Sequence, residues 1–484
     1  MKIENGKLSV DITEKQKKLI KLSLLTLISV VIYLIGAKEI GDPDAFWHIK
    51  TGEWILKNKQ VPTMDIFSWY GKEQGLTWTN HEWLFEITLY LFYKFFGFKG
   101  VFFFVNIISI ALFISLYKLC EIKSKDFILS LVIAVVSILA IRGILVPRPQ
   151  IMSYLLFIIV AILYEKKKWF LALITTIITI NFHGGVYPIF IILAIYYCYK
   201  EKPLMILLVC LSILLNPNGF ELITYTIKNR SSDLGVRFIS EAQLTSMAAG
   251  SNLLILIIYM CLPLILHKVE KIKLDTVIYI YAYIGLTFLA ERHTVFAYVV
   301  VLPELSKYIG KGFENILEYI NATALKKVEF KLNRHLLNLY LVILIFNLML
   351  YVSIENIRIM PYIAEDCISE IYPKKAVEYL KSHPLDNLYH SYDYGGYLIF
   401  NEIDTFVDGR ADPYSEKFND TTVLRDYMES DSLNKDIEEF FDKYDIKNIL
   451  LKKDDKLYFA LKHSDRYKEL YSDDDYVIWE RIGE

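Results

Sequence analysis

A succession of apolar runs, separated by short charged connectors, constrains this chain more than any other feature. A composition of 54% hydrophobic residues and a mean hydropathy of +0.33 exceed what a soluble core needs. A helix needs about 20 apolar residues to cross a bilayer, so the shorter runs require polar flanks to complete a crossing. We therefore expect a polytopic α-helical membrane protein with about eleven transmembrane helices. The runs lie at residues 19–37, 98–117, 127–141, 151–164, 169–180, 186–199, 204–215, 253–266, 277–290, 295–308 and 336–353.

Lys and Arg residues gather in every second connector, which predicts an orientation. Basic loops are retained on the cytoplasmic side, so the tail 1–18 is expected in the cytoplasm of a cell (plasma) membrane protein, with a first run that stays as an uncleaved anchor. An odd number of spans in the membrane domain 19–353 then puts the carboxyl terminus outside the cell. The basic connectors are residues 15–18, 118–125, 166–168, 200–202, 268–273 and 307–334.

The chain changes character after a linker at residues 354–372. Residues 373–484 contain 16 Lys and Arg against 26 Asp and Glu, a strongly acidic balance. Helical and strand-like patterns alternate there, which predicts a separate extracytoplasmic soluble α/β domain. The expected helices are 373–381 and 433–444, and the expected strands are 388–392, 397–400, 405–407, 447–451 and 477–481.

The remaining connectors, which we place outside, hold the unusual ionisable residues. An ionisable group near a span end is costly to bury unless it is paired or faces a wet cavity. Their segregation on one side therefore predicts that they converge on one external cavity. They include Asp42, Asp44, Arg142, Arg148, His183, Glu241, Arg292 and His293.

The first external loop, residues 38–97, is long enough to have its own structure. We expect an amphipathic helix over residues 44–58, with Asp44 capping its start. The apolar stretch 83–96 contains Glu86 and Lys94, so we place it as a helix in the membrane interface and not as a span. The tryptophans Trp47, Trp54 and Trp78 favour a membrane-interface belt over platforms for sugar rings.

Several short motifs accompany this layout. They are Asp42-Pro43-Asp44, Asp44-x-x-Trp47-His48-x-x-x-Gly52, Trp78-x-x-His81-Glu82-Trp83-Leu84, Arg148-Pro149-Gln150, Asn181-x-His183-Gly184-Gly185, Gly395-Gly396-Tyr397-Leu398 and Asp408-Gly409-Arg410. With the layout they resemble the GT-C membrane glycosyltransferases, which include protein O-mannosyltransferases, the lipid A aminoarabinose transferase and the catalytic subunit of oligosaccharyltransferase. The resemblance covers nearly the whole chain, and it is greatest to poorly characterised prokaryotic members.

The resemblance implies an inverting glycosyltransferase of the cell envelope. Its donor would be a polyprenyl-phosphate-linked sugar within the membrane lipids, and its acceptor a glycan, lipid or protein. Asp42 would take the acceptor proton, since a carboxylate can act as a general base. Asp44 would orient the acceptor or, with Asp42 and His183, hold a divalent metal, Mg²⁺ or Mn²⁺. No nucleotide cofactor and no nucleic acid partner are expected.

The leaving phosphate requires positive charge or hydrogen-bond donors. The candidates for substrate binding are Arg142, Arg148, Arg292 and His293 for the phosphate, together with Trp47, His48, His81, Glu82 and His183. Where the relatives carry a Pro-Pro-Leu type element after the first loop, this chain has His81-Glu82-Trp83-Leu84. This departure weakens any transfer of acceptor contacts from the relatives.

Structural alternatives compete with each functional assignment. Asp44 could serve as a helix cap, His183 could end a helix, and Arg292 could anchor a span at the headgroups. Two other classes of protein also stay open: a secondary transporter or lipid flippase, and a noncatalytic assembly or binding protein. A transporter usually has its charges near the bilayer midplane, whereas here they cluster at one face.

Overall fold

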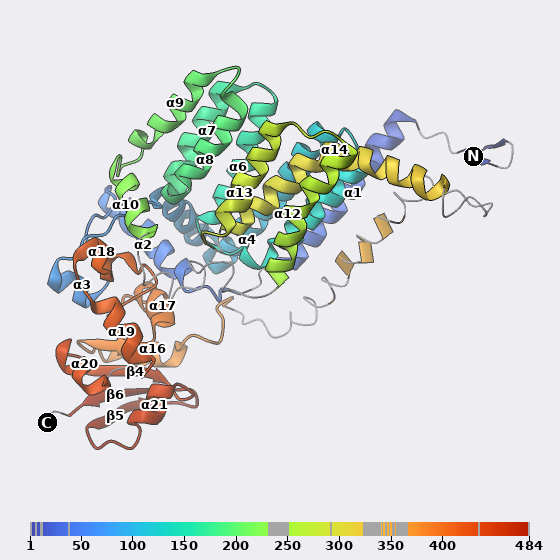
Figure 1. The fold of residues 1–484 in the computed structure, drawn as a ribbon. Helices are drawn as coiled ribbons and strands as arrows, with labels where there is room; N and C mark the ends of the chain where they lie inside the picture. The colour runs from blue at the N-terminus through green and yellow to red at the C-terminus, as the bar shows by residue number, and fades with distance from the viewer. Residues whose placement is uncertain are drawn as a thin grey trace.

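The computed structural model is mostly helical, with a small sheet near its carboxyl end (Figure 1). It describes residues 2–4, 7–9, 13–36, 39–230, 251–290, 293–322, 366–433 and 436–482, and scattered positions between 340 and 354. The expected span at 336–353, most of the linker 354–372, and Glu241 and Arg292 therefore lie wholly or largely outside the described residues.

The larger part is a helical bundle. The bundle helices pack around one apolar core, to which all of them except α10 contribute, and α4 packs against α1, α5, α6 and α14. They are α1 (Glu14–Ile35), α4 (Trp83–Ser124), α5 (Phe127–Ala140), α6 (Gln150–Glu165), α7 (Trp169–Phe182), α8 (Tyr187–Cys198), α9 (Pro203–Leu211), α10 (Glu221–Arg230), α12 (Ser251–Val269), α13 (Leu274–Thr287) and α14 (Thr294–Ala322). Before the bundle, Lys2–Glu4 (β1) and Lys7–Ser9 (β2) form an antiparallel pair.

One helix of the described residues, α4, is both long enough and apolar enough to cross a bilayer. The other apolar helices that meet the hydropathy pattern are 10–17 residues long. The helical character of the fold is thus confirmed, while the number of about eleven spans stays a prediction.

Helix α4 contains a break at Gly97, which has φ 61° and ψ −154°. A residue with a side chain rarely adopts this left-handed conformation, so glycine permits the change of direction. The segment 83–96 is therefore a helix of its own that meets the following helix at this kink, as expected, while its place in the membrane interface stays a prediction.

The first external loop contains α2 (Asp44–Asn58) and α3 (Trp69–Gln74). The bounds of α2 agree with the expected helix, but its N-terminal contacts differ. Its cap residue is Pro43, which has no side-chain donor or acceptor, and Asp42 Oδ1 accepts the Asp44 N–H at 3.0 Å. Asp42, and not Asp44, thus satisfies a free backbone donor at the helix start.

The carboxyl-terminal part combines a four-stranded sheet with short helices. The strand order is β3-β4-β6-β5, with β3 parallel to β4 and the other pairs antiparallel. The strands are β3 (Leu388–His390), β4 (Asn448–Lys452), β5 (Tyr467–Ser472) and β6 (Tyr476–Arg481). The helices are α16 (Lys374–Ser382), α17 (Gly395–Phe400), α18 (Glu416–Asn419), α19 (Val423–Asp431), α20 (Ile437–Lys443) and α21 (Lys456–Leu461).

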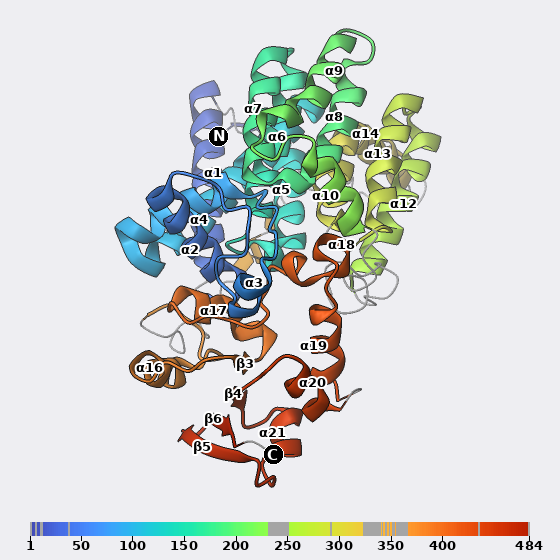
Figure 2. The same cartoon turned by 90° about the vertical axis from the view of Figure 1, so that its left-hand side faces the viewer.

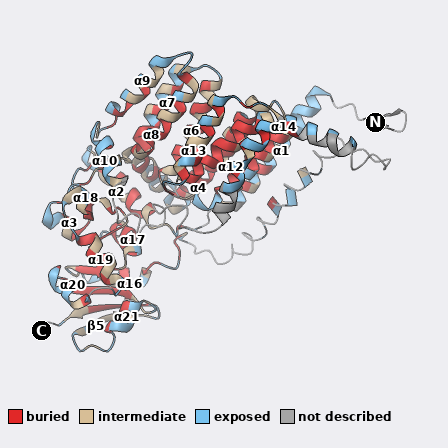
Figure 3. Ribbon diagram, viewed as in Figure 1, coloured by how far each residue is buried: buried red, intermediate tan, exposed pale blue. Residues whose placement is uncertain are grey.

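The first external loop and the carboxyl-terminal part share their cores. Trp69 and Leu76 pack with Phe406 and Tyr414, and Phe46 packs with Tyr397. In Figures 1 and 2 the loop helices α2 and α3 lie between the bundle and the sheet, and Figure 3 shows buried positions continuing through this junction. The division at residue 373 stays a prediction, but the two parts are not separated by solvent.

Candidate functional site

Asp42 and Asp44 meet one arginine at the start of α2. Arg148 donates from Nε to Asp42 Oδ2 at 2.5 Å and from Nη2 to Asp42 Oδ1 at 3.0 Å. Its Nη2 also lies 3.2 Å from Asp44 Oδ2. Arg148 reaches this point because it stands in the turn that leads into α6. We call Asp42, Asp44 and Arg148 the acidic cluster. The fork geometry of a guanidinium suits paired carboxylate or phosphate oxygens, so Arg148 can exchange a carboxylate partner for an anionic ligand.

The carboxyl-terminal part packs directly against the acidic cluster. A Cβ added at Gly396 would lie 1.9 Å from the Pro43 carbonyl oxygen, and one added at Gly409 would lie 2.3 Å from Asp44 Oδ1. Only a residue without a side chain permits such close approaches. Trp47 donates from Nε1 to the same Asp44 oxygen at 3.0 Å. Both glycine motifs of the sequence therefore face the start of α2.

A second group, which we call the histidine cluster, consists of His81, Glu82 and His183. Glu82 Oε1 lies 3.5 Å from His81 Nε2 and 3.6 Å from His183 Nε2. The three ligand atoms lie within 4.8 Å of one another, which is close enough for one metal ion. His183 ends α7, and Ser153 Oγ lies 3.0 Å from its Nδ1.

The donor set of the histidine cluster differs from the expected metal ligands. We predicted Asp42, Asp44 and His183, but the two aspartates pair with Arg148, and the described residues bring His81 and Glu82 to His183 instead. Two imidazoles and one carboxylate fit a divalent transition metal such as Mn²⁺ or Zn²⁺ better than Mg²⁺, which prefers an all-oxygen shell.

His48 lies behind the histidine cluster in the protein interior. Its Nε2 is 3.9 Å from Glu82 Oε2, and its Nδ1 is 3.6 Å from Glu86 Oε1. Burial lowers the pKa of His48 well below its usual range, and the charges of Arg148, His81 and His183 lower it further. The distances from His48 to the two glutamates are too long for hydrogen bonds, and His48 Nδ1 and Glu86 Oε1 are buried without a hydrogen-bond partner among the described residues.

Helix α6 connects the two clusters. Arg148 stands immediately before its first turn and Ser153 lies within that turn, so one short segment contacts both Asp42 and His183. The backbone also closes the arrangement, because Gly184 N–H donates to the His81 carbonyl at 2.9 Å. Asp42, Asp44 and Arg148 thus contact one another, and the same segment reaches His183, while their convergence on one external cavity stays a prediction.

Two other candidates, Arg142 and His293, lie in turns next to helix ends. Arg142 is exposed in the 3-10 turn Arg142–Ile144, and the described residues give it no side-chain partner. His293 Nδ1 pairs with the Leu286 carbonyl at 3.2 Å in the turn between α13 and α14.

The prediction that Trp47 and Trp78 belong to a membrane-interface belt was wrong. Both are buried, at 6% and 5% exposure, and they pack with Ile399. The reason is that the carboxyl-terminal part covers the loop face that we expected to meet lipid.

A third charged group lies deeper in the junction. Arg410 donates from Nε to Asp408 Oδ1 at 2.8 Å, and its Nη2 lies 2.8 Å from Asp65 Oδ1. The guanidinium stands 4.8 Å from the Trp78 ring and 5.1 Å from the Phe67 ring. Burial raises the pKa of Asp408, but the Arg410 charge outweighs it and holds that pKa below the usual range. This group ties the Asp408-Gly409-Arg410 loop to the first external loop.

Three residues that contact the site or its neighbours were not predicted from the sequence. Asn80 donates to Glu86 Oε2 at 2.7 Å, and Ser153 meets His183. Tyr225 of α10 donates to Asp412, and its ring lies 4.4 Å from His81. Asn80 follows Trp78 within a quoted motif, but no local pattern marks Ser153 or Tyr225.

No family model and no curated protein matches this sequence. Among solved structures, the chain is similar to the archaeal oligosaccharyltransferase AglB from Archaeoglobus fulgidus in complex with an inhibitory peptide and a dolichol-phosphate. The TM-score is 0.56 at 11% identity, over 90% of this chain and 70% of that one.

A second structure of the Archaeoglobus fulgidus oligosaccharyltransferase, tethered to an acceptor peptide with the NVT sequon, gives a TM-score of 0.55 at 12% identity. It covers 96% of this chain and 74% of that one. ArnT from Cupriavidus metallidurans in the apo state matches with a TM-score of 0.48 at 12% identity, over 96% of this chain and 98% of that one. The chain therefore shares the fold of the archaeal oligosaccharyltransferase, as its sequence led us to expect.

Proposed function

We propose that this chain is an inverting glycosyltransferase that moves a sugar from a polyprenyl-phosphate-type lipid to an acceptor at the outer face of the plasma membrane. The observation that carries the proposal is Arg148 held between Asp42 and Asp44 beside the histidine cluster. This arrangement offers a carboxylate base and a guanidinium for phosphate within a few ångströms. The shared fold supports it, since the similar oligosaccharyltransferase was solved with a dolichol-phosphate and a peptide.

The first step is binding of the donor phosphate. The two free oxygens of a diester phosphate offer Arg148 the same paired contact that the Asp42 carboxylate offers, and the two groups carry the same single negative charge. Arg148 can therefore turn toward the phosphate while it keeps one contact to Asp44. This exchange leaves the Asp42 carboxylate free to accept a proton.

The second step is the transfer itself. The acceptor heteroatom attacks the anomeric carbon from the face opposite the phosphate, and Asp42 takes its proton. The bond between the anomeric carbon and the phosphate oxygen breaks, and the phosphate leaves with the electron pair. Arg148 stabilises the charge that develops on it. Attack from the opposite face inverts the configuration at that carbon.

His81, Glu82 and His183 would hold a divalent metal in this mechanism, with Mn²⁺ favoured over Mg²⁺ by the two imidazoles. Such an ion supplies positive charge for phosphate oxygens. Ser153 and the Gly184 backbone fix the side chains and the loop around that position. The amino terminus would face the cytoplasm and the carboxyl-terminal part the outside, as the basic connectors predict.

The proposal is tested with purified protein in lipid and a panel of radiolabelled polyprenyl-phosphate sugars. We expect transfer, or slow hydrolysis of the donor, to fall by about 10²- to 10⁴-fold in Asp42→Asn while donor binding survives. Asp454→Asn, an exposed aspartate that pairs with Lys452, is the matched control and should keep parental turnover. If neither the parent nor the control binds or consumes any donor, a transporter or an assembly protein becomes the better interpretation.

A further inference from the structure

A cavity lies between α8 and α13, away from the acidic cluster. Its volume is about 630 Å³. Helix α8 starts just after His183 and Gly184 and, at 12 residues, carries the chain about 18 Å to the end where Lys200 stands. This groove, lined by residues 192–200 and 273–282, is therefore at the end of the bundle opposite the histidine cluster.

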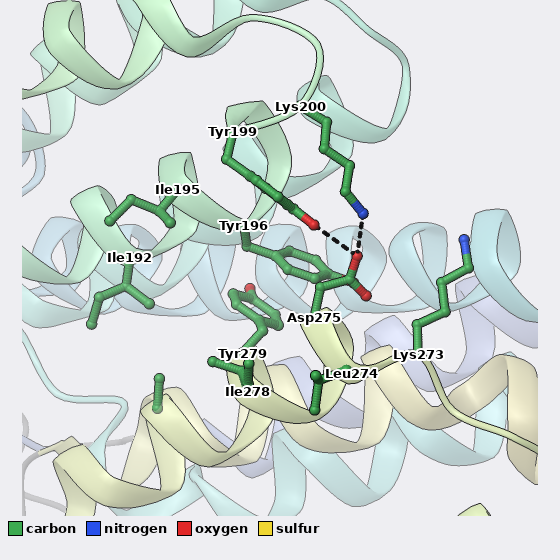
Figure 4. A pocket seen from close by; sticks show the side chains of 11 residues that line it. Ile192, Ile195, Tyr196, Tyr199, Lys200, Lys273, Leu274, Asp275, Ile278 and Tyr279 are labelled. Carbon is green, nitrogen blue, oxygen red and sulfur yellow. Dashed lines mark hydrogen bonds and ion pairs between the residues drawn. The ribbon is translucent and has the colours of Figure 1, made fainter.

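The walls of the groove are apolar over most of their length. Figure 4 shows Ile192 and Ile195 of α8 facing the groove together with Ile278 of α13. Ile195 and Ile278 are 48% and 61% exposed, so these side chains lack a protein partner that covers them. Apolar surface of this kind is covered by lipid in a membrane protein.

Two stacked tyrosines, Tyr196 and Tyr279, make the floor rigid. Their ring centroids are 3.9 Å apart with an angle of 11° between the planes. Tyr196 donates to Glu304 at 2.7 Å and lies 3.2 Å from Thr276 Oγ1. The stacking and these hydrogen bonds hold the two rings that form the floor in place.

One end of the groove is positively charged. Lys200 donates to Asp275 Oδ2 at 2.9 Å, and Tyr199 donates to the same oxygen at 3.1 Å. An ammonium has three donors, so Lys200 is held in place by Asp275 and keeps two for a ligand. Lys273 lines the same end and has no acidic partner among the described residues (Figure 4). Two lysines against one aspartate leave this end with a net charge of one positive unit.

We propose that this groove binds an anionic glycerophospholipid. One acyl chain lies along Ile192, Ile195 and Ile278, and the phosphate lies against Lys200 and Lys273. Basic pockets between helices on the cytoplasmic side suit anionic headgroups, and these lysines belong to connectors that the charge pattern places in the cytoplasm. The proposal depends on the membrane location proposed above but not on sugar transfer.

Native mass spectrometry of the detergent-purified full chain tests this site. With phosphatidylglycerol added, the parent should retain one lipid. Each basic residue near a membrane surface contributes about fivefold in affinity, so Lys200→Gln with Lys273→Gln should weaken retention by roughly 25-fold. Lys202→Gln with Lys271→Gln, exposed lysines of the same two connectors that do not line the groove, should retain the lipid as the parent does.

Further arms separate the headgroup from the acyl chain. Ala282→Phe fills the apolar part and should reduce retention with the lysines intact. Phosphatidylcholine, with no net charge, should be retained far less than phosphatidylglycerol, and inorganic phosphate alone should not compete at equal concentration. Equal retention of both lipids, or equal retention by the two lysine double variants, would overturn the site. No sugar donor is present, so failure here leaves the proposed transfer reaction untouched.

Discussion

Two arginines in this protein each stand between two aspartates, yet the two groups differ in burial. The side chain of Arg148 is 23% exposed, with Asp42 at 10% and Asp44 at 15%. The side chains of Arg410 and Asp65 are fully buried, as is that of Asp408. An ion pair that water reaches can exchange partners at low cost, whereas a fully buried one has no replacement for a lost partner. The same three residue types therefore make a site in one place and a structural tie in the other.

The strongest test of this comparison replaces each arginine with methionine. Arg410→Met leaves Asp408 and Asp65 buried without their cation and should lower the free energy of unfolding by about 3 to 5 kcal/mol. Arg148→Met should lower it by less, because Asp42 and Asp44 are only partly buried and water can reach them. Thermal unfolding followed by tryptophan fluorescence measures both. Arg425→Met, at an exposed pair with Glu416, is the matched control, and equal losses for Arg410 and Arg148 would contradict the comparison.

A low pH should destabilise the buried region around Asp408 and Arg410, where His390 lies. Burial lowers the pKa of His390 to about 4, below the usual 6.5 of the unfolded chain. Its Nδ1 faces the Ser391 carbonyl at 2.8 Å, and its Nε2 accepts the Phe406 N–H at 3.1 Å, so the neutral ring fits.

The unfolded state binds a proton first, so the stability that His390 contributes is complete above pH 6.5 and is lost as the pH falls toward 4. The loss amounts to about 3 kcal/mol. Unfolding curves at several pH values measure it, and His390→Asn should flatten the pH dependence in this window. An unchanged slope in the variant would assign the acid sensitivity to another group.

The contact between the two groups can be broken at Gly409. Alanine there would place a Cβ 2.3 Å from Asp44 Oδ1 and displace that carboxylate. A shift of about 1 Å in a reacting group can cost 10²-fold, so we expect kcat to fall by up to about that factor with little change in the KM for the donor. Gly143→Ala, where the added Cβ meets no atom within 4 Å, should behave as the parent. A raised KM with normal kcat would indicate a role in donor binding instead.

The smallest effect is expected at the rim of the same junction. Lys72 pairs with Asp404 at 2.7 Å, and both side chains are substantially exposed, at 41% and 56%. Lys72→Gln should change the free energy of unfolding by less than about 1 kcal/mol, and added salt should remove the difference. A larger loss of unfolding free energy that salt does not change would show that side-chain exposure does not determine how much these ion pairs stabilise the protein.

Local sequence patterns predicted many of the helices and strands, but they did not predict which distant residues contact one another. The bounds of α2 followed from its apolar periodicity and the Asp-Pro-Asp start. The run 397–400 was expected as a strand but lies in α17, because four apolar residues that are buried on all sides fit either structure. Strand β5 was missed, since its exposed polar residues obscure the alternation.

The same limit applies to the site. Asp42, Arg148 and His183 were candidates because of their chemistry and their place near span ends. Which arginine meets Asp42 could not be read from the sequence, since Arg142 and Arg148 stand six residues apart in the same connector. The acidic partner of His183 was likewise open: we expected Asp42 and Asp44, and only the fold selects Glu82.

The shared core of the first loop and the carboxyl-terminal part also sets an order of events during synthesis. Thr77 pairs with Asn419 across 342 residues, and Thr405 bridges to Ser68. A ribosome that adds about 5 to 20 residues per second needs on the order of tens of seconds to supply the second partner. Until then, Trp69, Trp78 and Phe46 lack the packing partners that the carboxyl-terminal part supplies. The newly made loop would therefore depend on the translocation machinery or a chaperone for protection. A chain that stops before residue 400 would keep this apolar surface exposed, and quality-control proteases could recognise it.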